Sequence, residues 1–324
     1  MKEHFVAVCT RNRPNELANI TRDLLNQSSP VELILIIDSS DSINHAQTDL
    51  LLGLDSKIKI YRTEPGLCKQ RNKALEILPQ TGIVTFFDDD IRLDHDYIAS
   101  VEKVFAGDVM VCGVGGRTSE ITNLSGWKKL LLRIIRADSN KSGKVLKSGI
   151  NVPFYDNSSV YKVDWLPGCC MSFKLEVAKN LKFDESRHGV GWGEDVDFSL
   201  KVSKFGILVI TPFSPVLHLR SEINRVGPNT RKIRELESRI KLATDFKDRV
   251  SISIVTLHFI ALDTYLFLTA YFSDCNTFKE KLVKVIGSPQ KIAYLFKTVA
   301  QTNISSYRYI KHQHKLMIAY RKNA

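Results

Sequence analysis

The stretch GIVTFFDDD, residues 82–90, places three consecutive aspartates directly after an apolar run. A short run of this kind, rich in β-branched and aromatic residues, is typical of a strand. Carboxylates this close together repel, so the cluster costs stability unless a cation or an ordered turn uses it. We therefore expect a strand that leaves the core and presents Asp88, Asp89 and Asp90 at its tip.

Similar apolar runs precede this stretch, and helical patterns separate them. Residues 31–37, VELILII, are almost continuously apolar, as in a strand buried on both faces of a parallel sheet. The alternation predicts a doubly wound α/β sheet, whose ligands bind at the carboxyl ends of the strands. Asp38 and the three aspartates follow such strands, so we expect them to converge on one crevice. The predicted strands span 4–10, 31–37, 57–62 and 82–87. After a turn at Arg13 and Pro14, a helical period runs through Leu17, Ile20 and Leu24, and a second helix is predicted over 68–78.

The pattern changes after residue 108, where strands are expected with fewer helices between them. The stretch GEDVDFSLKVSKFG, residues 193–206, predicts a short helix that ends at a Gly206 cap. A basic stretch with weak periodicity occupies residues 128–149, and the chain becomes helical from about residue 229. The further predicted strands span 108–116, 163–173, 207–213 and 215–220.

The positive charge of the chain is confined to its last third. The net charge is +11 over 324 residues. Residues 1–225 hold 29 Lys and Arg against 28 Asp and Glu, whereas residues 226–324 hold 17 against 7. A nucleic-acid-binding protein would show a basic surface with aromatic side chains or a known module, and the first 225 residues are almost neutral. We expect a boundary near residue 225 and no nucleic-acid partner.

The six cysteines and the first residues indicate the compartment. The cysteines form no C-x-x-C pair, so reduced and mostly buried thiols are expected. The first apolar run is too short for the core of a signal peptide. We expect a cytoplasmic chain. The cysteines are Cys9, Cys68, Cys112, Cys169, Cys170 and Cys275.

One segment of the basic region is long and apolar. Residues 252–272 contain one charged side chain, Asp263, and are long enough to span a bilayer. Asp263 and His258 are unfavourable inside a membrane. The Lys and Arg residues in 279–297 and 308–322 favour a helix on an anionic membrane surface. A helix that spans the membrane, one buried in the protein and one that contacts a partner are all compatible with the same stretch.

The aspartate cluster and a second acidic motif can carry chemistry. Mg²⁺ and Mn²⁺ prefer carboxylate oxygens, and a D-x-D spacing at a strand tip places two carboxylates near one point. A solvated acidic loop would show the same residues. In GWGEDVDFSL, residues 191–200, Glu194 and Asp195 fall in the first helical turn, where the helix dipole keeps a carboxylate ionised. Such a carboxylate can accept a proton from a hydroxyl, or it can simply cap the helix.

The order of these motifs resembles the family-2 glycosyltransferases of the GT-A fold, over residues 4–220. The resemblance implies a nucleotide-sugar-binding fold with a mixed, mainly parallel central sheet, followed here by a C-terminal helical extension. The basic region 226–324 would then be an addition to a GT-A domain at 1–225. The motifs that carry it are VCTRNRP (8–14), IIDSS (36–40), PGLCKQRNKAL (65–75), the aspartates, VDWLPGCCMSF (163–173) and GEDVDFSLKVSKFG (193–206).

The resemblance also implies roles for individual residues. Asp195 would be the catalytic base, and Asp89 could replace either of its neighbours. His218 would complete the metal or diphosphate site, although a lone histidine is more often structural. Many members carry a second acidic residue at the position of Ser39, and its absence here leaves the choice of nucleotide base open. The implied nucleotide-sugar contacts are Thr10, Arg11, Asp38, Arg71, Asp88 and Asp89; the metal ligands are Asp88, Asp90 and His218; Trp192 and Glu194 lie on the acceptor side.

The implied reaction is an inverting, Mn²⁺- or Mg²⁺-dependent sugar transfer from a nucleoside-diphosphate-sugar to a hydroxyl. A glycan or lipid-linked acceptor at the inner face of the cell membrane, as in surface polysaccharide assembly, would suit the basic region. A sugar nucleotidyltransferase is the rival enzyme, but it would carry a Gly-rich loop, and residues 9–19 contain no glycine. The alternatives that are not enzymes are a nucleic-acid-binding protein and a non-catalytic scaffold. The donor sugar, its base, the acceptor and the oligomeric state are left open.

Overall fold

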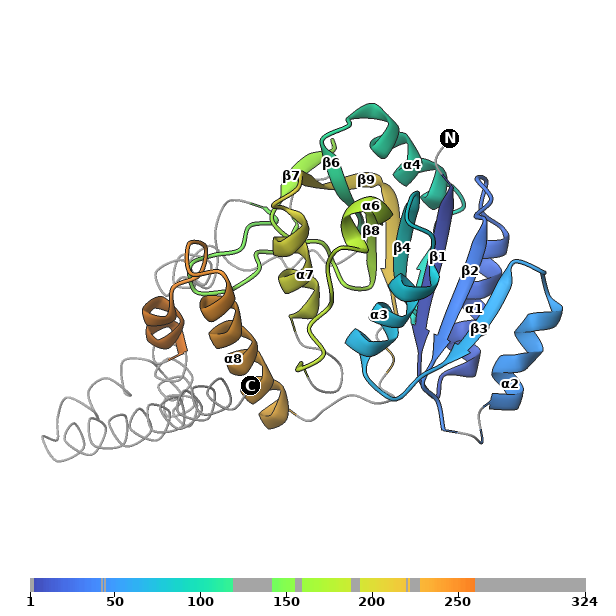
Figure 1. The fold of residues 1–324 in the computed structure, drawn as a ribbon, viewed down its shortest axis with the longest axis horizontal. Helices are drawn as coiled ribbons and strands as arrows, with labels where there is room; N and C mark the ends of the chain where they lie inside the picture. The colour runs from blue at the N-terminus through green and yellow to red at the C-terminus, as the bar shows by residue number, and fades with distance from the viewer. Residues whose placement is uncertain are drawn as a thin grey trace, which may run out of the picture.

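The computed structural model describes residues 3–259, apart from 42, 44, 119–141, 155–158, 188–192, 220 and 222–227. Within these residues the chain forms a nine-stranded mixed sheet with helices on both faces (Figure 1). The strand order is β3-β2-β1-β4-β8-β6-β9-β5, and β7 pairs with β9. The predicted α/β class and the mixed, mainly parallel sheet are confirmed.

The first half of the sheet is parallel and is built from the first four predicted strands. Its members are β1 (His4–Thr10), β2 (Leu33–Asp38), β3 (Ile58–Arg62) and β4 (Ile83–Asp88). The crossovers are α1 (Pro14–Leu25), α2 (His45–Asp49) with η2 (Leu50–Gly53), and α3 (Leu67–Ile77). The register pairs Thr10 with Asp38, Asp38 with Arg62, and Cys9 with Asp88. The polar residues at the strand ends therefore lie side by side.

The second half of the sheet mixes directions. Strand β8 (Cys170–Lys174) is antiparallel to both β4 and β6 (Val111–Thr118). Strand β9 (Ile207–His218) is parallel to β6 and antiparallel to β5 (Ile91–Leu93) and β7 (Tyr161–Val163). The remaining helices of this half are α4 (Tyr97–Gly107), α6 (Leu175–Ala178) and α7 (Glu194–Val202).

Two apolar layers enclose the sheet, and the alternation of β1 supplies both. Phe5 and Ala7 join one hydrophobic cluster, and Val6 and Val8 join the other. The second cluster receives α1 and α4, whereas the first receives α3, α6 and α7. Each fully buried Val, Leu, Ile or Phe contributes roughly 1.5–3 kcal/mol. Strand β2 is buried on both faces in the same way, which explains why residues 31–37 include almost no polar side chain.

Several details differ from the sequence expectations. Helix α7 ends at Val202 with Ser203 as its C-cap, so the predicted cap at Gly206 is wrong. Gly206 instead packs against β6, where an added Cβ would lie 2.3 Å from Cys112 Sγ. The segments predicted as 207–213 and 215–220 are one strand, β9. Its register with β6 shifts between Gly116 and Arg117 of β6. The strand expected over 163–173 begins only at Cys170.

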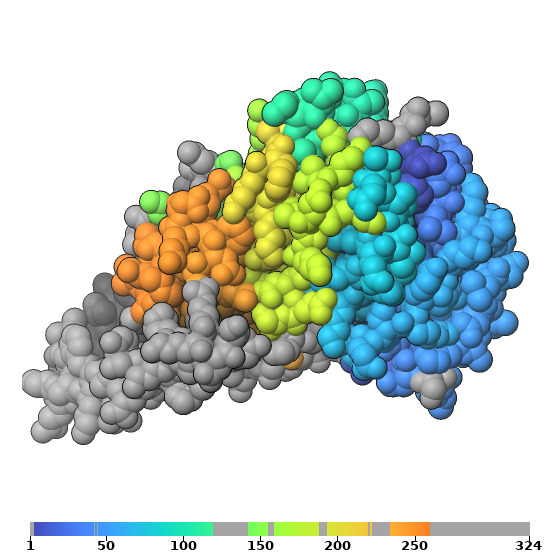
Figure 2. Space-filling model, in the orientation of Figure 1, coloured from blue at the N-terminus to red at the C-terminus, as the bar shows by residue number. Residues whose placement is uncertain are grey.

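The first part of the basic C-terminal region packs on the α/β unit. Helix α8 (Pro228–Asp245) lies beside α7, and the orange surface of this region adjoins the yellow-green surface before it (Figures 1 and 2). Ile240, Phe246 and Val255 belong to the same hydrophobic cluster as α7. No helix among the described residues is long and apolar enough to cross a membrane. Only 252–259 of the apolar segment 252–272 lie inside the described residues.

Candidate functional site

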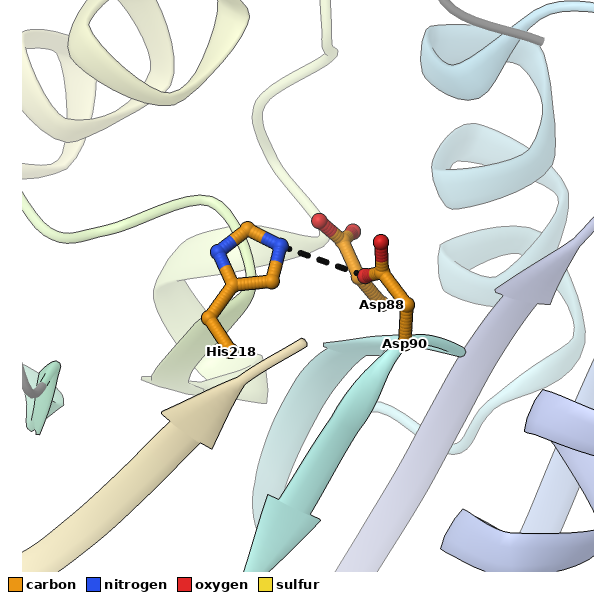
Figure 3. Close-up of side chains that lie close together, drawn as sticks. All are labelled: Asp88, Asp90 and His218. Atoms are coloured by element: carbon orange, nitrogen blue, oxygen red, sulfur yellow. Dashed lines mark ion pairs between the residues drawn. The ribbon is translucent and has the colours of Figure 1, made fainter. Parts of the chain in front are cut away.

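Three side chains meet where β4 and β9 end. Asp88 is the last residue of β4, Asp90 lies in the turn before β5, and His218 ends β9. Strand β5 brings the turn to β9 by pairing Ile91 with His218. One ligand atom from each of the three lies within 4.8 Å of the others, and His218 Nε2 is 3.2 Å from Asp90 Oδ1 (Figure 3).

Neighbouring groups fix this cluster. The Ser221 N–H donates to Asp90 Oδ2 at 3.0 Å, and the Leu219 N–H donates to the Asp90 carbonyl. Burial lowers the pKa of His218, but hydrogen bonds with Asp90 and Cys169 outweigh it and raise that pKa to about 10. Two carboxylates and one imidazole are a ligand set that suits Mn²⁺ and tolerates Mg²⁺, and a cation bound here would displace the proton of His218. The three residues therefore fit a divalent cation.

Asp89 is directed away from the cluster, toward the loop after β1. The Thr10 hydroxyl donates to Asp89 Oδ2 at 2.7 Å, and Arg13 Nη1 donates to Oδ1 at 2.8 Å. Burial raises the pKa of Asp89 to about 7 although Arg13 and Thr10 oppose the rise. Arg13 Nη1 also lies 3.4 Å from Asp90 Oδ2. The central aspartate thus joins β4 to β1, which its position in the sequence did not reveal.

Arg71 lies beneath the site rather than on its surface. Its side chain is 1% exposed, and Nη1 donates to Glu194 Oε1 at 2.9 Å. Nη2 donates to the Gly168 carbonyl at 2.8 Å and lies 3.3 Å from Asp88 Oδ1. Burial and the neighbouring Asp195 raise the pKa of Glu194, and Arg71 opposes this rise. The guanidinium therefore connects β4, the approach to β8 and the start of α7.

Replacing Arg71 by methionine is expected to lower the free energy of unfolding by about 3–5 kcal/mol, because two carboxylates would lose a buried partner. Chemical denaturation measures the change. Lys73→Ala is the matched control on α3, since Lys73 makes an exposed pair with Glu76 that is worth at most about 1 kcal/mol. A loss below about 1 kcal/mol in Arg71→Met would contradict the central structural role of the guanidinium.

Asp195 sits in the first turn of α7, half-buried. Its Oδ1 accepts a hydrogen bond from the Val196 N–H at 2.8 Å, and its Oδ2 accepts one from the Gly168 N–H at 3.2 Å. Burial raises the pKa of Asp195, while these backbone donors lower it. Gly168 contacts both Asp195 and Arg71, so the carboxylate and the metal cluster are linked through one loop.

The carboxyl end of β2 is covered by an arginine that the sequence did not single out. Asp38 is 0% exposed, and its carboxylate accepts hydrogen bonds from Arg62 and from the Ser40 N–H. Arg62 also binds Asp49. Arg62 ends β3, so the rule that pointed to Asp38 applied to it equally. Arg11, in contrast to the buried Asp38, is exposed, and its Nη2 lies 3.9 Å from Asp41 Oδ1.

The structure thus gathers Thr10, Asp38, Asp88, Asp90 and His218 along one edge of the sheet. Trp192 lies outside the described residues. All five cysteines within the described part of the chain are free and buried, as expected.

Two solved structures share this arrangement of strands and helices. The mannosyltransferase PcManGT from Pyrobaculum calidifontis, in complex with GDP-Man and Mn²⁺, aligns with a TM-score of 0.58 at 16% identity, over 94% of this chain and 87% of its own. GalNAc-T7 with UDP, GalNAc and Mn²⁺ aligns with a TM-score of 0.58 at 15% identity, over 75% of this chain. The alignment spans only 48% of GalNAc-T7. At these identities the likeness shows the fold, which is GT-A.

Sequence comparison identifies the family. No curated protein matches the chain. The family model described as glycosyl transferase family 2 matches residues 5–176, which cover β1 to β4, the aspartates and β8. This match takes in more than half of the chain. The chain therefore belongs to glycosyl transferase family 2, whose members transfer a sugar from a nucleotide-sugar donor.

Proposed function

We propose that this enzyme is an inverting, metal-dependent glycosyltransferase that moves a sugar from a nucleoside-diphosphate-sugar to a hydroxyl of a glycan or lipid-linked acceptor. The observation that carries the proposal is the joint placement of the Asp88, Asp90 and His218 cluster and the Asp195 carboxylate. Arg71 contacts Asp88 on one side and Glu194, the neighbour of Asp195, on the other. A donor-side site and a proton acceptor are therefore built into one connected group.

The donor would lie along the carboxyl ends of β1, β2 and β4. Asp88, Asp90 and His218 would hold a divalent cation, which when bound neutralises the negative charge that develops on the leaving diphosphate. Thr10, Arg11, Asp38 and Asp89 are the proposed contacts on the nucleotide side. The structures of PcManGT with GDP-Man and Mn²⁺ and of GalNAc-T7 with UDP and Mn²⁺ support a nucleoside-diphosphate donor. Because their bases differ, the donor panel should include both GDP-sugars and UDP-sugars.

Asp195 would take the proton of the acceptor hydroxyl as that oxygen attacks the anomeric carbon from the face opposite the leaving group, which inverts the configuration. A carboxylate whose pKa is raised by burial is a better proton acceptor than a solvated one. The Gly168 and Val196 N–H groups would hold it in place. One base is sufficient, in contrast to the carboxyl pair of glycoside hydrolases.

The test is a panel of nucleoside-diphosphate-sugars, each incubated with the enzyme and Mn²⁺. We expect one donor, or a small group with a common base, to raise the melting temperature and to release nucleoside diphosphate slowly in the absence of acceptor. Inversion is checked by NMR of the anomeric proton of the product. A panel without any stabilising donor would contradict the proposal.

The basic region supports a membrane-borne acceptor at the cytoplasmic face. Residues 226–324 carry a net charge of +10, and each Lys or Arg near an anionic leaflet contributes about 1 kcal/mol. The apolar part of 252–272 would add burial at the interface. Because Ile240, Phe246 and Val255 pack into the α/β unit, a truncation that tests this idea should follow residue 259 rather than residue 225.

Full-length protein is expected to float with anionic vesicles and to lose binding in high salt, because salt screens the attraction. Vesicles of neutral lipid should bind it more weakly. The chain cut after residue 259 should stay in the dense fraction with its α/β unit folded. Equal flotation of the cut and intact proteins would place any membrane contact elsewhere.

A further inference from the structure

Helix α8 meets the N-terminus of α7, the helix that carries Asp195 (Figure 1). The contact is tight at Gly193, the N-cap residue of α7, which has the left-handed φ of 76°. A Cβ added to Gly193 would lie 2.3 Å from Ser238 Oγ of α8 but 3.4 Å from Ser238 Cβ. The close approach is therefore between the backbone of the cap and one hydroxyl.

A buried arginine ties the same hydroxyl to α7. Arg187 Nη1 donates to Ser238 Oγ at 2.8 Å, and its Nη2 lies 3.5 Å from Asp197 Oδ1. Asp197 is 1% exposed and also pairs with Lys201, so it is fixed within α7. Arg187 and Gly193 flank residues 188–192, which lie outside the described part of the chain. Both flanking residues thus meet at Ser238.

These contacts bracket Asp195. The Asp197 N–H donates to the Gly193 carbonyl at 3.1 Å, which closes the first turn of the helix around Asp195. The Asp195 carboxylate is held from the other side by the Gly168 N–H. A shift of Gly193 or Asp197 would therefore move the carboxylate relative to Gly168. Displacing a catalytic group by about 1 Å can cost about 100-fold in rate.

We propose that Ser238 and Arg187 are positioning residues, through which α8 holds the first turn of α7 and so the Asp195 carboxylate. This inference rests on the proposed role of Asp195 as the base. It gives the start of the C-terminal region a second task, since α8 then contributes to the rate of transfer in addition to any part in membrane contact.

The test is a pair of substitutions and their combination. Gly193→Ala is expected to lower kcat by about 10- to 100-fold while the donor KM changes by less than about 2-fold, because the base is displaced and the donor site is not. Ser238→Ala removes the hydroxyl that the new Cβ would meet. The double variant should be more active than Gly193→Ala and should approach the kcat of Ser238→Ala, because the added Cβ no longer meets a hydroxyl. Gly193→Ala and the double variant both carry an alanine at the positive φ of residue 193, so the backbone strain there is the same in both and cancels when they are compared.

Ser238→Ala alone is expected to lower kcat by only about 2- to 5-fold, because Arg187 loses its charge-assisted hydrogen bond to α8 but keeps its ion pair with Asp197 in α7. This variant keeps the proposal testable if Gly193→Ala does not fold. Thr244→Ala is the control on the same helix, since its hydroxyl donates to the Ile240 carbonyl within α8. It should leave kcat unchanged.

Two outcomes would overturn the inference. One is an unchanged kcat per folded molecule in Ser238→Ala, with only the free energy of unfolding reduced. The other is a double variant no more active than Gly193→Ala. Asp195→Asn, measured alongside, distinguishes a failure of the proposed base from a failure of the positioning role. If it retains turnover, the proposed base is wrong; if it loses turnover while the α8 variants do not, only the positioning role is wrong.

Discussion

Replacing Asp195 by asparagine is expected to reduce turnover by roughly 10²- to 10⁴-fold, the usual scale for loss of a general base. Asparagine keeps the size of the side chain and can still accept the Gly168 hydrogen bond, but it cannot take a proton from the acceptor. Donor affinity should stay close to that of the wild type, because the carboxylate acts on the acceptor. Initial rates at saturating donor and acceptor measure the first effect, and calorimetric titration with the nucleoside diphosphate measures the second.

Asp245→Asn is a suitable control for this prediction, since Asp245 is an exposed acid on α8, away from the first turn of α7. It should change neither quantity. A loss of donor affinity in Asp195→Asn, in step with the loss of turnover, would instead make Asp195 part of the donor site.

Chelation is expected to abolish transfer, and added Mn²⁺ or Mg²⁺ is expected to restore it. Asp88, Asp90 and His218 together offer two carboxylates and an imidazole, and the ligand set has no substitute among the described residues. Asp90→Ala should weaken donor binding and turnover together, because Asp90 would help to hold the cation whose charge offsets that of the diphosphate. Donor binding by calorimetry, with and without Mn²⁺, is a readout independent of activity.

Asp108→Asn provides the control for the metal prediction. Asp108 is an exposed acid at the C-cap of α4 and is not part of the cluster. The concentration of Mn²⁺ that gives half-maximal activity should therefore stay within a few-fold of the wild-type value. Full activity of the wild type in excess EDTA would remove the metal from the mechanism.

Much of the fold follows from local patterns. The run 31–37 is apolar because both faces of β2 are covered, and such runs are visible in a sequence. Strands β5 and β7 have three residues each, which is too short for a period to appear. Helix α4 is absent from the sequence-based expectations, although Ile98, Val101 and Phe105 of its buried face follow a helical spacing.

The candidate site could be predicted in part. The rule that ligands bind at carboxyl ends of parallel strands brought Asp38 and Asp88 to one edge. His218 entered only by resemblance, because β9 reaches the cluster through a pairing with β5 that no local pattern indicates. The burial of Arg71 and the contacts of Arg13 depend on packing between distant segments. Net charge along the sequence carries no information about such pairs.

The order of the strands has a consequence for protein engineering. Strands β1, β2 and β3, with Thr10, Asp38 and Arg62 at their ends, form one flank of the sheet and come from the first 62 residues. The cluster of Asp88, Asp90 and His218 lies where β4 and β9 end. A chimaera that takes residues 1–81 from a relative would exchange this flank as a block. Its designer must carry over Thr10, Arg13 and Arg71 together, because Asp89 on the retained side bonds the first two and Asp88 and Glu194 pair with the third.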